Sequence, residues 1–213
     1  MKKLLIAAAL AAASSAFAGD FYTGIGLPGL QFGYAQPVSE SLVLRADVST
    51  LGHHSRSRTE DNLNYDAKIK ADRLGLFADW YFAGNWRAVG GLTFTNARAD
   101  LRGSGNGATI TIGNTTYTAG PNEGFDVAVK FPRTMPYLGI GYGRGPKAEK
   151  GWSLAFDLGV AIGKPKVSGS VRGTLLSSQV SQADIDRELA EIRDDADSIK
   201  GIPQLSLAVN YRF

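Results

Sequence analysis

The sequence predicts an all-β protein, namely an antiparallel up-and-down transmembrane β-barrel of eight to ten strands with one short acidic helix before the last strand. Apolar residues alternate with polar or small residues over at least seven segments, and this period of two is typical of half-buried strands. Segments 69–82 and 86–100 are longer than ordinary strands and long enough to cross a membrane at a tilt. The 26 glycines also fit a narrow barrel, whose crowded inner face favours residues without side chains.

The chain begins with the three parts of a bacterial secretory signal peptide. Lys2 and Lys3 precede an apolar run over residues 4–13, and residues 16–18 read Ala-Phe-Ala, the pattern that signal peptidase cleaves. Because this run is too short to cross roughly 30 Å of hydrocarbon, a membrane anchor is excluded. We expect residues 1–18 to be a signal peptide cleaved near Ala18, and residues 19–213 to be the barrel domain, located in the outer membrane.

Charge and cysteine content exclude several classes of function. The chain carries 23 Lys and Arg against 20 Asp and Glu, and loss of Lys2 and Lys3 with the signal peptide lowers the formal net charge from +3 to +1 (21 against 20). This balance is too even to indicate nucleic acid as a partner. The absence of cysteine excludes a disulfide framework, a cysteine-based metal site and thiol catalysis.

The alternating segments define the expected strands. In chain order they are 42–51, 69–82, 86–100, 125–131, 137–142, 152–162, 166–175 and 204–213. With Phe213 placed at the periplasmic end, segments 204–213, 152–162, 125–131 and 69–82 run toward that end and the others run away from it. Segment 21–34 supplies either two short strands broken at Pro28-Gly29, which makes ten, or one irregular strand.

Connections and aromatic residues support the membrane orientation. Short turns are expected at 37–41, 83–85, 132–136 and 163–165, and long polar loops at 52–66 and 102–124, which is typical of periplasmic turns and extracellular loops. Aromatic residues gather at strand ends, where an interfacial girdle would lie: Trp80, Tyr81, Phe82, Trp86, Tyr137, Trp152, Tyr211 and Phe213.

Charged residues on the polar faces of the strands form a candidate network in the barrel lumen. By alternation, its members are Arg45, Asp47, Arg73, Asp79, Arg87, Asp126, Lys130, Asp157, Arg172 and Arg212. In a barrel of eight strands these side chains would pair into a plug of salt bridges. A tenth strand would widen the bore and favour a narrow, weakly anion-preferring pore.

Residues 181–200 interrupt the alternation and predict a helix. Ser181 can cap it, apolar residues recur at helical spacing, and Gly201-Ile202-Pro203 ends it. Seven acidic and three basic residues give this segment a net charge of −4. It is either an acidic lid or divalent-cation site, or a solvated amphipathic helix on the barrel rim, and the spacing of an EF-hand is absent. The candidate cation ligands are Glu188, Glu191, Asp194, Asp195 and Asp197.

Three short motifs in the sequence do not indicate a function. Residues 24–29 match GxGxxG, but the proline and the alternation that follow exclude a dinucleotide-binding turn. His53, His54 and Ser55 are the only candidates for a nucleophile and base, with Asp61 and Asp66 nearby, and chain neighbours in a strand point apart. The sequon at 114–116 has no expected role in a bacterial chain.

Several blocks carry a resemblance to a known group. They are the signal ending at 16–18, the block 136–143 (Pro-Tyr-Leu-Gly-Ile-Gly-Tyr-Gly), the segment 151–167 and the terminal 209–213 (Val-Asn-Tyr-Arg-Phe). With these the chain resembles the small outer-membrane β-barrel proteins of Gram-negative bacteria, the group that includes the OmpA transmembrane domain and OmpW. The resemblance implies recognition of the last strand, ending at Phe213, by the barrel-assembly machinery, and contact with outer-membrane lipid and lipopolysaccharide.

The resemblance supplies no catalytic residues, and we expect no cofactor, no metal and no nucleic acid. The expected function is a structural or surface-interaction role through the extracellular loops. The alternative is a narrow pore for small solutes or ions, and an outer-membrane enzyme ranks third. The sequence names no extracellular ligand.

Overall fold

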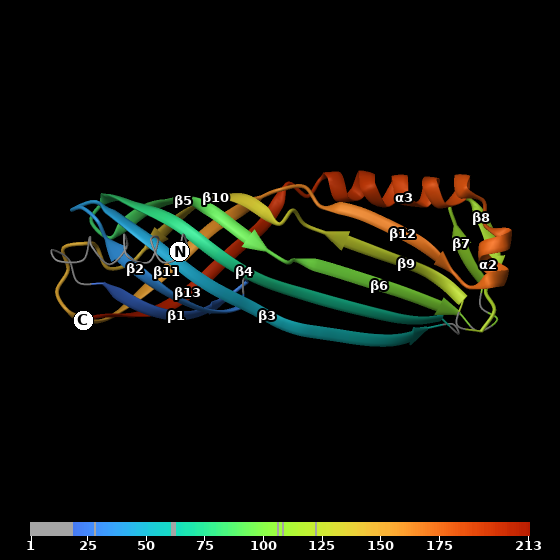
Figure 1. Cartoon of the computed structure of the whole chain (residues 1–213), viewed down its shortest axis with the longest axis horizontal. Helices are drawn as coiled ribbons and strands as arrows, with labels where there is room; N and C mark the ends of the chain where they lie inside the picture. Colours follow the sequence, from blue (N-terminus) through green and yellow to red (C-terminus); the bar gives the residue numbers. More distant parts are fainter. Residues whose placement is uncertain (1–18, 28, 61–62, 106, 108, 122) are drawn as a thin grey trace, which may run out of the picture.

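The computed structural model describes residues 19–213 apart from residues 28, 61–62, 106, 108 and 122, so the expected signal peptide lies outside the described residues. The side chains of residues 60, 63 and 197 are also outside them. The protein is elongated, with a barrel at one end and an extension of the same strands at the other (Figure 1). Phe21 and Phe213 stack at the outer end of the barrel with ring centroids 5.6 Å apart, so the two ends of the described chain meet there.

Within the described residues, eight antiparallel strands close the barrel. Around the ring the order is β1, β2, β3, β4, β5, β10, β11 and β13, and β13 pairs with β1 to complete it. The strands are β1 (Asp20–Gly26), β2 (Gly29–Pro37), β3 (Leu42–Glu60), β4 (Leu63–Ala83), β5 (Trp86–Thr95), β10 (Thr134–Tyr142), β11 (Gly151–Ile162) and β13 (Gly201–Arg212). The barrel therefore falls within the expected eight to ten strands, and segment 21–34 supplies two of them.

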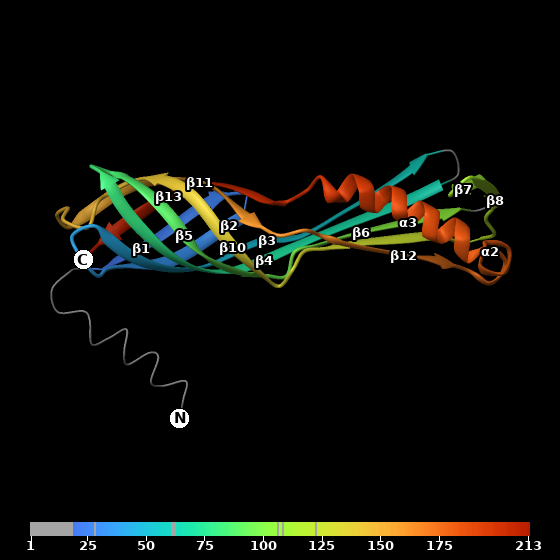
Figure 2. The same cartoon turned by 90° about the horizontal axis from the view of Figure 1, so that it is seen from above.

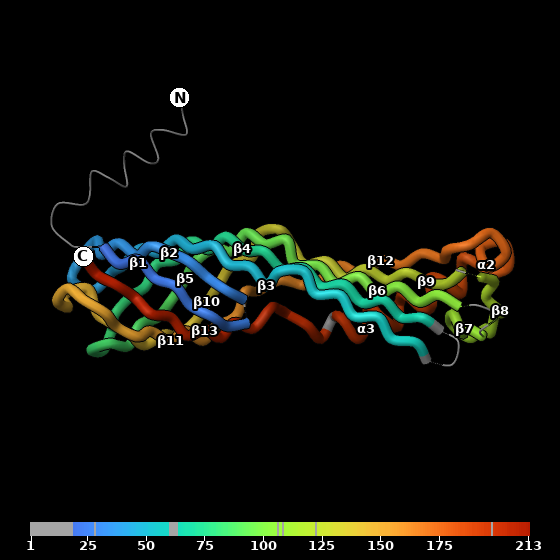
Figure 3. Tube along the Cα trace, turned by 90° about the horizontal axis from the view of Figure 1, so that it is seen from below, coloured from blue at the N-terminus to red at the C-terminus, as the bar shows by residue number. Residues whose placement is uncertain are grey.

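The extension continues the wall of the barrel. The distal parts of β3 and β4 join three further strands in a sheet of order β12, β9, β6, β4, β3. The added strands are β6 (Arg98–Gly105), β9 (Glu123–Lys130) and β12 (Lys166–Arg172). β6 prolongs β5 against β4 without a change of register, and β9 leads into β10 in the same way. Five walls of the ring thus continue as an open trough, whereas β1, β2 and β13 stop at the barrel (Figures 2 and 3).

A hairpin and two helices cover the distal end and the concave face of the trough. They are β7 (Thr109–Ile112), β8 (Thr115–Thr118), α2 (Thr174–Gln179) and α3 (Gln182–Asp197). Ser181 caps α3, because its hydroxyl accepts the N–H of Asp184 at 3.1 Å. α3 lies along β12, and a Cβ placed on Gly169 would meet Leu189, so the helix sits closely on the sheet. The helix predicted over 181–200 is confirmed, and α2 is an addition that the sequence did not indicate.

Two of the predicted barrel strands are wrong, because segments 125–131 and 166–175 belong to the extension. The segments at 132–136 and 163–165 look like hairpin turns in the sequence, but each joins two strands that run in the same direction. The predicted directions of 137–142 and 152–162 are therefore reversed. β10 runs toward the end with the termini, and β11 runs away from it.

The outer surface of the barrel is an apolar belt. Leu74, Leu76, Leu154 and Leu207 point outward and leave between 43 and 64% of their surface exposed. Aromatic pairs lie near the end with the termini, including Trp86–Tyr142 and Trp152–Tyr211 with centroids 5.1 and 4.9 Å apart. No described helix is long and apolar enough to cross a membrane.

Two of the aromatic residues expected in the girdle lie elsewhere. Tyr81 and Tyr137 occupy odd positions of strands whose even positions face outward, so both point into the barrel. Tyr81 donates its hydroxyl proton to the carbonyl of Arg144 at 2.8 Å, and Tyr137 is only 4% exposed. The girdle was predicted from clusters of aromatic residues in the sequence. Neighbouring residues of a strand point to opposite faces, so such a cluster does not show which of its members face outward.

Candidate functional site: the closed barrel interior and the charged extension

Two arginines and two aspartates form an alternating cluster in the middle of the barrel, here called the central quartet (Arg45, Asp79, Arg87 and Asp157). Each arginine contacts both aspartates: Arg45 Nε lies 2.7 Å from Asp79 and its terminal nitrogen 3.2 Å from Asp157. Arg87 lies 3.2 Å from Asp79 and 2.8 Å from Asp157. All four side chains are nearly or fully buried, so two positive and two negative charges compensate one another away from water.

The Nε contacts of the quartet are ion pairs rather than aligned hydrogen bonds. The carboxylate oxygens of Asp79 and the Nε atoms of Arg45 and Arg87 are buried without a hydrogen bond of good geometry among the described residues. Asp157 is different, because both terminal nitrogens of Arg45 and one of Arg87 donate to it. Asp79 is therefore stabilised by electrostatic attraction alone, whereas Asp157 is stabilised by both electrostatic attraction and directional hydrogen bonds.

A second layer closes the barrel on the side of the extension. Arg73 pairs with Asp47 at 2.6 Å and donates to Gln204, and the Tyr22 hydroxyl donates to Asp47 at 2.9 Å. The ring of Phe77 lies 5.5 Å from the Arg73 guanidinium, which adds a cation–π contact. This layer ties β1, β3, β4 and β13 together across the lumen.

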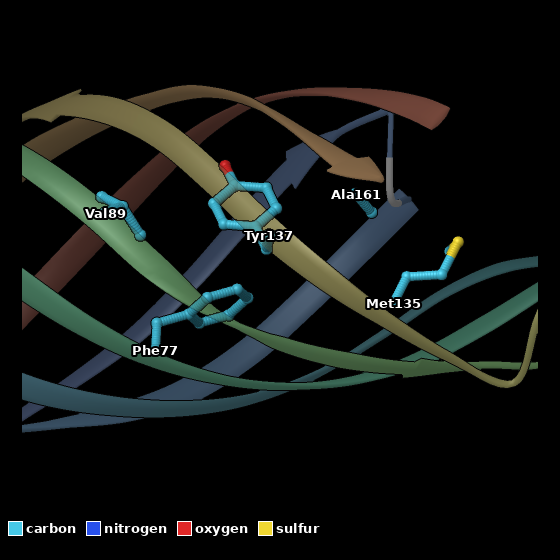
Figure 4. Close-up of a cluster of buried hydrophobic side chains, with 5 residues drawn as sticks. All are labelled: Phe77, Val89, Met135, Tyr137 and Ala161. Carbon is cyan, nitrogen blue, oxygen red and sulfur yellow. The ribbon is translucent and has the colours of Figure 1, made fainter. Parts of the chain in front are cut away.

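An apolar cluster fills the neighbouring part of the interior (Figure 4). It contains Phe77, Val89, Met135, Tyr137 and Ala161, all at most 6% exposed. The rings of Phe77 and Tyr137 meet edge to face with centroids 5.0 Å apart. Around the central quartet the remaining cavity is about 20 Å³, which is room for about one water molecule.

A third polar layer closes the end of the barrel that carries the termini. Arg212 forms two bonds with Asp20, at 2.6 and 2.7 Å. The same guanidinium also donates to the carbonyls of Gly145, Pro146 and Ala148, which belong to the β10–β11 connection. One buried arginine therefore fixes the first strand, the last strand and this connection together.

Seven of the ten predicted lumen residues lie inside the barrel, and the structure gathers them into the three polar layers just described. They are Arg45, Asp47, Arg73, Asp79, Arg87, Asp157 and Arg212. Asp126, Lys130 and Arg172 do not, because β9 and β12 are walls of the extension. Asp126 instead pairs with Arg172 at 2.6 Å and with Arg102 at 3.4 Å, where all three side chains are partly exposed.

Sequence reasoning missed Asp20, Tyr22 and Gln204 as interior residues. The signal for the first two was present, because Asp20, Tyr22 and Gly24 alternate with outward Phe21 and Ile25.

The acidic helix packs on the extension through some of its carboxylates. Asp184 accepts hydrogen bonds from the hydroxyls of Ser181 at 2.7 Å and of Tyr117 at 2.8 Å, and both bonds lower the pKa of Asp184. The bond to Asp184 raises the pKa of Tyr117. Glu188 accepts the N–H of Gly113 at 2.9 Å. These contacts hold α3 to the β7–β8 hairpin.

A second carboxylate joins α2 to the sheet. Burial works to raise the pKa of Glu123, but backbone N–H groups of Gly120, Leu175 and Leu176 outweigh it and lower that pKa. The Leu175 and Gly120 bonds are 2.8 and 3.0 Å long.

The remaining candidate sites are not assembled in the part of the chain described. No group of three or more His, Asp or Glu side chains there is placed to hold a metal ion, and Glu191, Asp194 and Asp195 are exposed. The side chain of Asp197 lies outside the described residues, as does Asp61.

The histidine pair lies on the edge strand of the extension. His53 is opposite Lys70 and His54 is opposite Ile69, so the two imidazoles face opposite sides of the sheet. Asp66 accepts a hydrogen bond from Ser57. The glycine motif at 24–29 spans the end of β1 and the start of β2, and Pro28 lies outside the described residues.

Comparisons with known proteins support the architecture. No protein-family model and no curated protein matches the chain. Among solved structures, the chain is similar to CarO of Acinetobacter baumannii, with 18% identity and a TM-score of 0.56 over 94% of this chain and 99% of that one. CarO2 of the same organism gives the same identity and TM-score over 92% and 99%. The fold is an antiparallel β-barrel, as in these two structures.

A more distant match is a major outer membrane protein from Thermus thermophilus, with 12% identity and a TM-score of 0.42 over 93% of this chain and 100% of that one. The finer likeness of this barrel to the OmpA and OmpW group stays a prediction.

Proposed function

We propose that this protein is an anchored surface-interaction protein of the bacterial outer membrane. In this proposal the first 18 residues are removed, the barrel spans the membrane, and the extension is the part that meets partners outside the cell. The observation that carries the proposal is the filled barrel interior, in which three polar layers and an apolar cluster leave about 20 Å³ around the central quartet. The interior of an eight-stranded barrel is just wide enough for side chains to fill, so this barrel would serve as an anchor and not as a channel.

The orientation follows from the two ends of the barrel. At the end with the termini, β2 and β3 are joined by residues 38–41 and β4 and β5 by residues 84–85. Bacterial barrels place short turns in the periplasm and longer segments outside, so the extension would be extracellular. The final strand β13, with Phe213 directly after it, would then be presented to the barrel-assembly machinery from the periplasm.

Opening the interior would be costly. Separating Arg45 and Arg87 from Asp157 would leave charges in a space that excludes water, with a penalty of several kcal/mol for each ion. The layers at Arg73 and Arg212 would also have to open. The energetics therefore favour an anchor over the pore for small solutes or ions.

Ion conductance of the purified full chain in a planar bilayer tests this proposal, with a bacterial porin as the positive control. We expect no channel steps from this protein under conditions in which the porin conducts. Regular steps from the wild-type chain would overturn the anchor role and establish the pore.

The natural absence of cysteine allows the placement to be tested separately. Glu191→Cys places a thiol on the exposed face of α3, and Glu40→Cys places one in the β2–β3 turn. A membrane-impermeant maleimide should label the first variant on intact cells and the second only after the outer membrane is permeabilised. The reverse result would invert the orientation.

A further inference from the structure

A row of basic side chains crosses the extension immediately beyond the barrel. Lys70 of β4 is opposite Arg98 of β6, Arg98 is opposite Lys130 of β9, and Lys130 is opposite Lys166 of β12. Directly opposite residues on neighbouring strands share one face of a sheet. Four adjacent strands therefore present four cations at one level, here called the basic row (Lys70, Arg98, Lys130 and Lys166).

The basic row is only partly compensated by the protein. Lys70 lies 3.2 Å from Asp72, and Arg98 bonds to Asp100 at 2.6 Å. Within the described residues, Lys130 and Lys166 are exposed and have no carboxylate at ion-pair distance. Like charges directly opposite each other destabilise a sheet, so an arrangement of this kind favours an anion that bridges them.

The levels farther from the barrel are different. The next level places Lys68 opposite Asp100, and the one beyond it places Arg102 opposite Asp126, with those two side chains 3.4 Å apart. Opposite charges alternate there. A level made of cations alone is thus confined to the position next to the barrel, although Asp100 bonds to Arg98 rather than to Lys68.

The register places the basic row on the same surface as the apolar belt. Even positions of β4, including Leu74 and Leu76, face outward in the barrel, and the pairing continues without a shift to Lys70. Phe94 and Arg98 are related in the same way. Four residues separate each pair, about 13 Å along a strand and less in height because barrel strands tilt. At a tilt of about 45° the height is about 9 Å, which places the row at or just above the head-group layer of about 5–8 Å that borders a hydrocarbon core.

A hollow of about 560 Å³ lies on the same face. Arg98 and Lys130 line it, and Lys68, Arg102, Ser168 and Ser170 continue it away from the barrel. The carboxylates of Asp66, Asp100 and Asp126 line it as well. It therefore offers cations at the membrane side, and hydroxyls with charges of both signs beyond. A phosphorylated sugar needs both kinds of donor, because lysine and arginine bind phosphate and hydroxyls bind sugar.

We propose that the basic row is a docking site for the phosphate groups of phosphorylated glycolipids in the outer leaflet, with the sugar in the hollow above it. This inference rests on the proposed position of the barrel in the outer membrane. It gives the belt one preferred lipid-binding side, formed by β4, β5, β10 and β11 below the row. The opposite side, formed by β1, β2 and β13, has no extension above it.

Lipid binding by the full chain in neutral phosphatidylcholine nanodiscs tests the inference. Bis-phosphorylated lipid A is titrated into discs that hold either the wild-type chain or Lys130→Gln/Lys166→Gln, and retained glycolipid is counted by native mass spectrometry. We expect the double variant to bind at least about tenfold more weakly, since each basic group near a membrane adds to the affinity for anionic lipid. Arg56→Gln/Arg193→Gln is the matched control, because it removes the same charge from exposed positions outside the row. It should bind like the wild-type chain.

Two further arms identify the source of the phosphate. Lipid A without phosphates should bind no better to the wild-type chain than to the double variant, and inorganic phosphate at millimolar concentration should not displace the intact glycolipid. Displacement by inorganic phosphate would overturn the lipid assignment in favour of a free anion. Equal binding of lipid A by the wild-type chain and the double variant would also overturn the inference, whereas failure of the chain to insert into discs would refute the membrane proposal itself.

Discussion

The barrel and the extension share strands but reverse the polarity of their two faces. In β4, Leu74 and Leu76 point outward within the barrel, and Lys68 and Lys70 occupy the same face in the extension. On the other face, Asp79 is buried among charges in the barrel. The hydrogen-bonded register of β4 against β5 and then β6 does not change between the two regions, whereas β3 carries a bulge against β4 between Thr50 and His53. Along β4 the reversal therefore lies in the order of its residues, and in the proposed membrane position it marks where the surroundings change from lipid to water.

The same reversal explains why the interior of the barrel is polar and the concave face of the extension is apolar. In the proposed membrane position, lipid covers the apolar outer surface of the barrel, so the lumen can be filled by paired charges. In the extension the concave face must be covered by protein, and α2, α3 and the β7–β8 hairpin do this through a cluster of buried residues. That cluster includes Ile112, Leu176 and Val180, with Phe125 and Ile185 packed against it.

Removing one carboxylate from the central quartet should have the largest effect. Asp157→Asn leaves Arg45 and Arg87 with too little negative charge, and we expect it to lower the free energy of unfolding by about 3–5 kcal/mol. Asp126→Asn, in the partly exposed pair with Arg172, should cost less than about 1 kcal/mol. Urea unfolding in lipid vesicles, followed by heat-modifiable migration on gels, measures both. Equal costs would show that the barrel interior does not depend on paired charges.

Placing a charge on the outer surface should separate the two regions next. Leu76→Arg puts a guanidinium into the apolar belt and should cost about 2–4 kcal/mol if lipid surrounds it. Ser170→Arg, on the same outer surface but in the extension, lies opposite Asp126 and should change stability by less than about 0.5 kcal/mol. The same unfolding assay compares them. A tolerated Leu76→Arg would contradict the lipid-facing role of the belt.

Acid should weaken the docking of the helices on the extension and leave the barrel folded. The folded pKa of Asp184 lies below its ordinary value of 3.8, and that of Glu123 lies below 4.5. A lowered carboxylate pKa contributes stability that is present above the ordinary value and is lost as the pH falls through the folded value. We therefore expect α3 to stay docked at neutral pH and to loosen below about pH 4.

Hydrogen exchange of the α3 amides, corrected for the intrinsic effect of pH, measures this loosening. Asp184→Asn removes one of the two carboxylates and should give a flatter pH dependence together with faster exchange at neutral pH. A pH profile of α3 exchange in Asp184→Asn that matches the wild-type profile would exclude Asp184 as the source.

The sequence predicted the β-barrel, its strand period and the acidic helix, because each depends on local alternation or helical spacing. It did not predict that β9 and β12 leave the ring. Residues 131–133 and 163–165 contain Pro132 and Pro165, and a proline between two strands looks the same in a bend as in a hairpin turn. Which of the two forms depends on the neighbouring strand, and that information is not local.

Seven of the predicted lumen residues were correctly assigned to inward faces, but their pairing was not predictable. Alternation places Arg45, Asp79, Arg87 and Asp157 on inward faces, yet their distances in the chain reach 112 residues. Only closure of the ring brings β3, β4, β5 and β11 around one point. The basic row was equally invisible, since Lys70, Arg98, Lys130 and Lys166 meet only through the cross-strand register.

The sequence by itself therefore determined the kind of strand, which face of each strand is apolar, and where that face changes. The tertiary structure decided which strands form the ring, which continue beyond it, and which charges neutralise one another. The physical reason is the range of the interactions. Alternation reports the surroundings of each residue along one strand, whereas ring closure and charge pairing depend on contacts between strands that are far apart in the chain.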